Sequence, residues 1–132
     1  MHYAVTRLRL TDFRNYGALA LDPARGSVVL TGENGAGKTN LLEALSYLSP
    51  GRGLRGARLV DVGRLEAKAR VWSVAATVDG PDGPVDVGTG LQPRPGSDAD
   101  AVRRVVHIDR QPAGGPAALG DVVRMMWLTP QM

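Results

Sequence analysis

The sequence predicts an α/β fold in which one strand–loop–helix unit precedes a β-rich stretch. First, an apolar run over residues 27–31 leads into a glycine-rich turn. Second, leucines recur after that turn at helical spacing, at Leu41, Leu42, Leu45 and Leu48. Third, apolar and polar residues alternate in several short runs between residues 69 and 109, which is typical of strands.

Residues 1–60 are expected to form the first unit. Loose alternation over 3–10 predicts a strand, and 18–21 is a short second strand after a turn. The run 27–31 does not alternate, as in strands that are covered on both faces. The leucine spacing over 41–48 predicts a helix that ends at a Ser-Pro-Gly sequence.

The second unit, residues 61–128, is expected to be an antiparallel β subdomain. The predicted elements are strands over 69–78, 85–91 and 103–109, a polar tip over 92–100, a short helix over 117–121 and a final apolar run over 122–128. Together the two units predict a mixed sheet. Because the sequence ends just after an apolar run, the 132 residues are expected to be an interrupted, truncated part of a longer protein.

Composition excludes several classes of protein. The 43% of apolar residues is enough for a packed core. The chain contains no cysteine, which excludes disulfides, thiolate zinc sites and a cysteine nucleophile. There is no signal peptide or long apolar run, so a cytoplasmic protein is expected. The net charge of +3 is compatible with nucleic-acid binding but does not require it.

A phosphate-binding motif lies between the run 27–31 and the predicted helix. Its pattern, G-x-x-x-x-G-K-T, lets backbone N–H groups turn inward around an anion, and the helix N-terminus adds partial positive charge. The residues expected to contact the nucleotide are Gly32, Glu33, Asn34, Gly35, Ala36, Gly37, Lys38, Thr39 and Asn40. Lys38 is expected to reach the β- and γ-phosphates, and the Thr39 hydroxyl to take one Mg²⁺ position. The cofactors predicted from the loop are therefore a nucleotide and Mg²⁺; the family resemblance given below implies that the nucleotide is ATP.

The reaction is harder to predict than the ligand. An Asn-Lys-x-Asp string, which GTPases use to read the base, is absent. One carboxylate, Asp109, follows an apolar strand and could serve as a Walker B residue of a small phosphotransferase. The simpler interpretation is an exposed hairpin end, because Arg-Gln-Pro follows and no glutamate is adjacent. His107 and Trp72 lie in apolar strands, which favours structural roles for both. Trp72 and Trp127 could in principle stack on bases, but the sequence gives no specific indication of this.

The loop and three flanking segments resemble the RecF family within the SMC-like, ABC-type ATPases. The loop resembles the Walker A sequence of that group, Asn-Gly-x-Gly-Lys-[Ser/Thr]-Asn. The other matching segments are Leu10–Tyr16, which contains Phe-Arg-Asn-Tyr, Ser49–Arg55, and Trp127–Met132, which resembles the stretch with the Q-loop glutamine. The four segments occur in the family's order. The resemblance implies the N-terminal lobe of an ABC-type ATPase head, ending at the Q-loop.

The resemblance also implies residue roles. Arg14 and Asn15 would lie near the base or α-phosphate, although a solvated turn is the alternative. Gln131 would approach Mg²⁺ and the attacking water, making Lys38 and Gln131 the catalytic residues. The arginines of the loop after the helix would contact DNA, or would simply be solvated; they are Arg52, Arg55 and Arg58.

The implied function is ATP- and DNA-binding in replication, recombination, repair and the SOS response. A RecF-type protein would act at single-strand gaps and stalled forks through ATP-dependent homodimerisation, with RecR and RecO as partners. The Walker B Asp-Glu and the Ser-Gly-Gly signature of such ATPases are absent from the 132 residues. We therefore expect this chain alone to bind phosphates without hydrolysing ATP. The alternatives are an SMC-like chromosome-organising head and the small phosphotransferase that would use Asp109.

Overall fold

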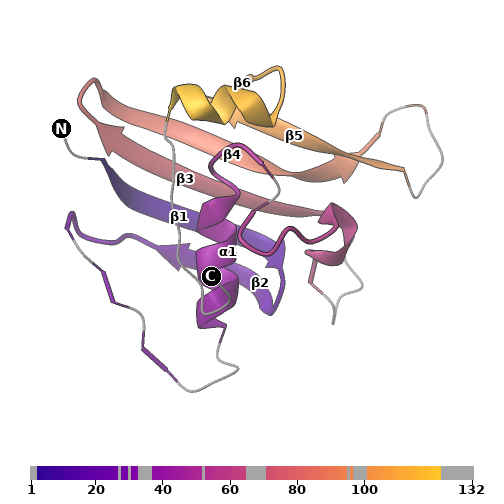
Figure 1. Cartoon of the computed structure of the whole chain (residues 1–132), viewed down its shortest axis with the longest axis horizontal. Coiled ribbons are helices and arrows are strands. Elements are labelled where there is room, and N and C mark those ends of the chain that lie inside the picture. The colour runs from indigo at the N-terminus through magenta and orange to yellow at the C-terminus, as the bar shows by residue number, and fades with distance from the viewer. Residues whose placement is uncertain are drawn as a thin grey trace.

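The chain folds as one antiparallel sheet with a helix packed on one face (Figure 1). The computed structural model describes residues 3–26, 28–29, 31–32, 37–51, 53–64, 71–94, 96 and 101–122. In chain order the elements are β1 (Ala4–Phe13), β2 (Tyr16–Leu21), α1 (Lys38–Ser46), the 3₁₀-helix η1 (Leu59–Asp61), β3 (Trp72–Gly80), β4 (Gly83–Pro93), β5 (Val102–Ile108), β6 (Gln111–Pro112) and the 3₁₀-helix η2 (Pro116–Asp121).

The strands lie in the order β2-β1-β3-β4-β5-β6, and each pair is antiparallel. β1 lies between β2 and β3, with Leu10 opposite both Leu19 and Val74. The expected first and second units therefore contribute strands to the same sheet. Their boundary near residue 60 falls within a connection and does not separate two sheets.

The two faces of the sheet differ in burial. On the inner face, alternate residues such as Leu10, Val74 and Val87 are at most 3% exposed, beneath α1 and η2. Three aromatic rings, those of Phe13, Tyr47 and Trp72, form the centre of this core with ring centroids 5.1–6.0 Å apart. Edge-to-face and tilted contacts of this kind add to the stability that burial alone supplies.

Trp72 is a core residue, as predicted. Its ring is 3% exposed and its indole N–H donates to the carbonyl oxygen of Leu59 at 2.8 Å. This bond attaches η1 to the end of β3. Trp127 lies outside the described residues.

A register shift between Val5 and Arg7 explains the loose alternation of β1. Before the shift Val5 faces Val78, and after it Leu8 faces Ala76, so both apolar side chains lie on the inner face despite their odd spacing. A bulge of this kind inserts one residue into a strand and restores the pattern beyond it.

Two expectations about the sheet are wrong for the residues that the structure describes. The sequence predicts a mixed sheet, whereas each pairing found is antiparallel. The run 27–31 was expected to be a doubly covered strand, but Val28 and Val29 lie outside the sheet and are 59% and 83% exposed. The reason is that β2 and β3 occupy the two edges of β1, so no place beside β1 is left for Val28 and Val29.

The remaining element predictions are largely confirmed. The strands expected over 3–10, 18–21, 69–78, 85–91 and 103–109 correspond to β1–β5, and the helix expected over 41–48 is α1. The short helix expected over 117–121 is the 3₁₀-helix η2. Most of the tip 92–100 and of the apolar run 122–128 lies outside the described residues. No described helix is long and apolar enough to cross a membrane.

Candidate phosphate-binding site

The N-terminus of α1 presents free backbone donors. Gly37 is its N-cap, with a φ of 100°, and the N–H of Leu41 donates to the Gly37 carbonyl oxygen at 2.9 Å. Among the described residues no side chain caps the helix, and its first turn contains no acidic residue. The first N–H groups of a helix have no partner within the helix, and the helix dipole gives this end partial positive charge. The site therefore favours an anion.

Gly37 is enclosed by the turn between β1 and β2. The Tyr16 hydroxyl donates to the Gly37 carbonyl oxygen at 3.0 Å. A Cβ at Gly37 would lie 2.6 Å from Asn15 Nδ2 and 2.7 Å from the Tyr16 oxygen. The positive φ and the lack of space both require glycine here. The hairpin turn thus fixes the place where the loop becomes a helix.

Lys38 reaches back across the loop. Its ammonium donates to the carbonyl oxygen of Gly32, the first glycine of the motif. An ammonium has three N–H donors, so two remain for phosphate oxygens. Thr39 follows in the first turn of α1 and is exposed. Residues 33–36, between Gly32 and Gly37, lie outside the described residues.

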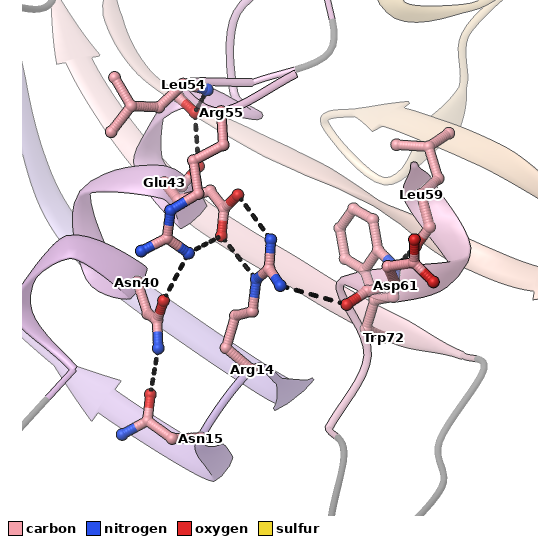
Figure 2. A network of polar contacts seen from close by, with 10 residues as sticks. Arg14, Asn15, Asn40, Glu43, Leu54, Arg55, Leu59, Asp61 and Trp72 are labelled. Atoms are coloured by element: carbon pink, nitrogen blue, oxygen red, sulfur yellow. Dashed lines mark hydrogen bonds and ion pairs between the residues drawn. The ribbon is translucent and has the colours of Figure 1, made fainter. Parts of the chain in front are cut away.

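A network of ion pairs connects the hairpin turn to α1 (Figure 2). Arg14 donates through Nε and Nη2 to the two carboxylate oxygens of Glu43, at 2.8 and 3.0 Å. Glu43 is fully buried, and its hydrogen bond raises the pKa of the Arg14 guanidinium. Arg14 also donates to the Asp61 carbonyl oxygen at 3.2 Å. One arginine therefore joins the turn, the helix and η1.

The network continues to the motif itself. Arg55 Nη1 donates to Glu43 Oε1 at 3.1 Å and to Asn40 Oδ1 at 2.7 Å. Asn40 in turn donates to Asn15 Oδ1 at 2.8 Å, as Figure 2 shows. Asn15 and Asn40, both predicted nucleotide contacts, are therefore brought together beside Gly37. Arg14, also predicted to approach the nucleotide, has its guanidinium on Glu43.

The other predicted site residues are placed differently. Arg58 pairs with Asp61 at 2.9 Å on the surface, and Arg52 and Gln131 lie outside the described residues. Asp109 lies in the exposed turn after β5, where its carboxylate accepts from the Asp86 N–H at 3.0 Å. β3 and β4 separate β5 from β1, so the structure does not bring Asp109 to the loop. The hairpin-end interpretation of Asp109 is confirmed.

Two residues of the site were missed by sequence reasoning. Tyr16 was considered only as part of a resembling segment, and Glu43 was not considered at all. The available signal for Glu43 was an acidic residue among apolar ones in α1, in which the only other charged residue is Lys38. Such a residue is buried only if cations reach it, and those cations come from distant parts of the chain.

An apolar groove of about 550 Å³ borders Lys38. It is lined by parts of β1, α1 and the segment before the loop, and Lys38 is the one charged residue among the described residues of its lining. Leu42, Val28 and Val29 contribute exposed apolar surface there. The phosphate-binding features therefore concentrate at the end of α1 and do not extend along this groove.

The fold and the loop are similar to those of several known proteins. A family described as an AAA domain matches residues 7–59. Two solved structures of the recombination mediator protein RecF, titled as its ATP and ATPrS forms in the RecFOR pathway, match with TM-scores of 0.74 and 0.75 at 21% identity. The matches cover 89% of this chain and 30% and 29% of those chains.

The sequence comparison identifies the particular relative. DNA replication and repair protein RecF of Agrobacterium fabrum is 51% identical over 129 residues, and that of Rhizobium meliloti is 52% identical over 128. These alignments cover 98% and 97% of this chain and 33% of each relative. The predicted resemblance to RecF is therefore confirmed, and the chain spans about a third of the length of these curated relatives.

Proposed function

We propose that this chain is the nucleotide-binding part of a RecF-type ATPase that acts on DNA in replication, recombination and repair. The observation that carries the proposal is the uncapped, acid-free N-terminus of α1 beside Lys38, held in place by Asn15 and Tyr16 at Gly37. RecF relatives at about 50% identity support the assignment.

The residues present fit ATP. Gly37 lets Asn15 and Tyr16 approach the start of the helix closely, where any Cβ would clash with them. The helix end supplies backbone donors, and Lys38 keeps two donors after its bond to Gly32. Bound ATP would supply a triphosphate for this cradle. Mg²⁺ belongs to the same proposal: the Thr39 hydroxyl would take one coordination position, and Gln131 would approach the metal from another segment.

The activity of the whole protein also belongs to the proposal. By the resemblance, ATP binding would drive homodimerisation on DNA at single-strand gaps and stalled forks, in the cytoplasm, with RecR and RecO as partners. Arg52, Arg55 and Arg58 remain proposed DNA contacts, and the pairing of Arg55 and Arg58 with carboxylates reduces their free charge. The 132 residues alone would bind phosphates without hydrolysing ATP.

Titration of Mg²⁺–ATP into the protein of natural length tests the nucleotide site. We expect Lys38→Ala to weaken ATP binding by about tenfold or more, because a charge-assisted contact to phosphate is removed. Arg94→Ala, at the far end of β4, is the matched loss of a cation and should bind ATP normally. Equal affinity for Lys38→Ala and the unaltered protein would refute the site. In the 132-residue chain, a phosphate-release assay showing turnover that Lys38→Ala abolishes would refute the absence of hydrolysis.

A further inference from the structure

The outer face of the sheet, opposite α1, is left uncovered by the described elements. α1 and η2 both contribute to the core on the inner face, as Figure 1 shows for α1. Four consecutive outward positions of the central strands bear small residues, namely Ser73, Ala75, Gly88 and Gly90, and Thr77 and Asp86 follow them. A smooth floor thus runs along β3 and β4.

Basic residues border this floor on both sides. Arg7 and Arg9 project from β1 on one side, and Arg103, His107 and Arg110 lie along β5 and its following turn on the other. Arg7, Arg9, His107 and Arg110 line a shallow cavity of about 400 Å³, whose single acidic lining residue is Asp86. We call this surface the outer trough.

Most of these cations are available to a ligand. Within the described part of the chain, no hydrogen bond or ion pair engages the side chain of Arg7, Arg103 or Arg110. Arg9 is held at the edge by Asp22 at 2.9 Å. The Asp86 carboxylate accepts from the Thr77 hydroxyl at 2.7 Å. The trough therefore presents exposed, unneutralised guanidinium groups above a floor with little side-chain bulk.

We propose that the outer trough binds the phosphate backbone of duplex DNA. The proposal rests on the proposed function, since it presumes a DNA-binding protein, and it assigns a surface that is separate from the arginine loop after α1. Three strand spacings separate β1 from β5, about 14 Å, and the DNA major groove is about 12 Å wide. Cations on the two sides can therefore meet phosphates of both strands.

The side chains of the trough favour duplex over single-stranded nucleic acid. Proteins that bind single strands on a sheet face stack bases on aromatic side chains. Among the described residues, the outward positions of β1, β3, β4 and β5 bear no Phe, Tyr or Trp. A surface that contacts only phosphates does not need exposed bases. Such a surface binds duplex DNA of any base sequence.

The side chains of the outer trough also favour DNA over an acidic peptide as the ligand. Peptide recognition combines charge with apolar anchors seated in pockets. The floor of the trough is glycine, alanine and serine together with the polar pair Thr77 and Asp86, and these residues offer no apolar anchor site. An extended polyanion that lies across a flat surface fits this composition better.

The test is a salt series of duplex binding, measured by fluorescence anisotropy on the protein of natural length with ATP present. The variant combines Arg7→Gln, Arg103→Gln and Arg110→Gln; the control is Arg25→Gln, an exposed arginine that pairs with Asp79. We expect the triple variant to lose about tenfold or more in affinity at moderate salt, and the slope of log K against log salt to fall by about two. The control should match the unaltered protein.

A second test compares two variants at Gly88, Gly88→Glu and Gly88→Gln, whose side chains differ in charge but not in size. A Cβ at Gly88 would meet its nearest neighbour, the Val74 carbonyl oxygen, at 3.8 Å, so side chains fit there. We expect Gly88→Glu to bind duplex about three- to tenfold more weakly than Gly88→Gln, because its carboxylate would face phosphates. Thermal melts of the two variants should agree, which separates this effect from misfolding.

The outcomes are distinct. Duplex binding by the unaltered protein, with the same affinity and slope in the triple variant, would overturn the trough and leave the proposed function intact. No duplex binding by the unaltered protein would overturn both. Loss of affinity for a polyglutamate peptide or an oligothymidine strand, with duplex affinity retained, would assign the trough to that other ligand and refute the proposal.

Discussion

Glu43 is a charged residue in the core of the molecule. Removing a carboxylate from water costs several kcal/mol unless good geometry and hydrogen bonds compensate. Here Arg14 approaches it through two nitrogens and Arg55 through a third, while both arginines keep part of their surface in solvent. The two ion pairs of Glu43 thus stabilise one arrangement of the hairpin turn, α1 and the following loop.

We expect Glu43→Gln to lower the free energy of unfolding by about 2 kcal/mol, because two guanidinium groups lose their anion. Urea denaturation measures the change. The matched control is Asp61→Asn, which makes the same chemical change at the exposed pair with Arg58 and should leave stability nearly unchanged. Similar losses in the two variants would show that the burial of Glu43 is not the cause.

The Tyr47 hydroxyl is buried and has no hydrogen-bond partner among the described residues. Its ring contacts Phe13 and Trp72, and the Arg104 guanidinium lies 5.5 Å from its centroid. Burial raises the pKa of the phenol, and the nearby Glu43 raises it further. The ring therefore stabilises the core, whereas the hydroxyl carries a desolvation cost.

We expect Tyr47→Phe to retain or raise the stability, by up to about 1 kcal/mol, because an unpaired buried hydroxyl is removed. The pKa of Tyr47 is higher in the folded state, so its contribution is constant below pH ~10 and is lost above it, where the unfolded chain ionises first. The advantage of Tyr47→Phe should therefore grow above pH ~10. Denaturation of both proteins at neutral and alkaline pH measures this; a destabilised variant would indicate a partner for the hydroxyl.

At the scale of elements, β4 has two glycines with different surroundings. A Cβ at Gly90 would lie 2.1 Å from the Trp72 carbonyl oxygen, which is backbone and cannot move aside. At Gly88 the nearest atom is 3.8 Å away. Close approach of β3 at one point thus requires glycine, and the neighbouring outward position does not.

We expect Gly90→Ala to destabilise the protein by about 2 kcal/mol or more, since β3 and β4 must separate locally. Gly88→Ala should change stability by less than about 1 kcal/mol. Thermal or urea unfolding of the two variants gives the comparison directly. Equal tolerance of alanine at both positions would contradict the backbone contact at Gly90.

The elements that could be predicted from the sequence are those with a local pattern. Alternation identified β3, β4 and β5, and the leucine spacing identified α1. The site was predictable at Gly37 and Lys38, because a glycine-rich turn between an apolar run and a helix has few other uses. Pairing is not local, so the exposed positions of Val28 and Val29 could not be deduced. The burial of Glu43 likewise depends on Arg14 and Arg55, from distant segments.

At the scale of the whole molecule, the sheet separates two kinds of surface. The inner face packs against α1, so the end of the helix that is proposed to bind phosphate is fixed relative to β1 and β2. Arg104 fastens β5 to this side, donating to the Tyr47 carbonyl oxygen at 3.0 Å and to Thr89 Oγ1 at 3.0 Å. The outer face carries the trough. A rigid sheet therefore holds the two proposed ligands on opposite sides.

The position of β1 between β2 and β3 also limits the order in which the sheet can form during folding. The hairpins β1–β2 and β3–β4 join neighbouring residues and close through short turns. The β1–β3 pairing instead sets Ala4 opposite Asp79, with β2, α1 and the arginine loop after α1 in the intervening stretch of chain. The entropy of closing that loop must be lost before the pairing stabilises anything. The strands therefore cannot join the sheet in sequence order. During synthesis β1 can pair only with β2 until the chain through Asp79 has left the ribosome.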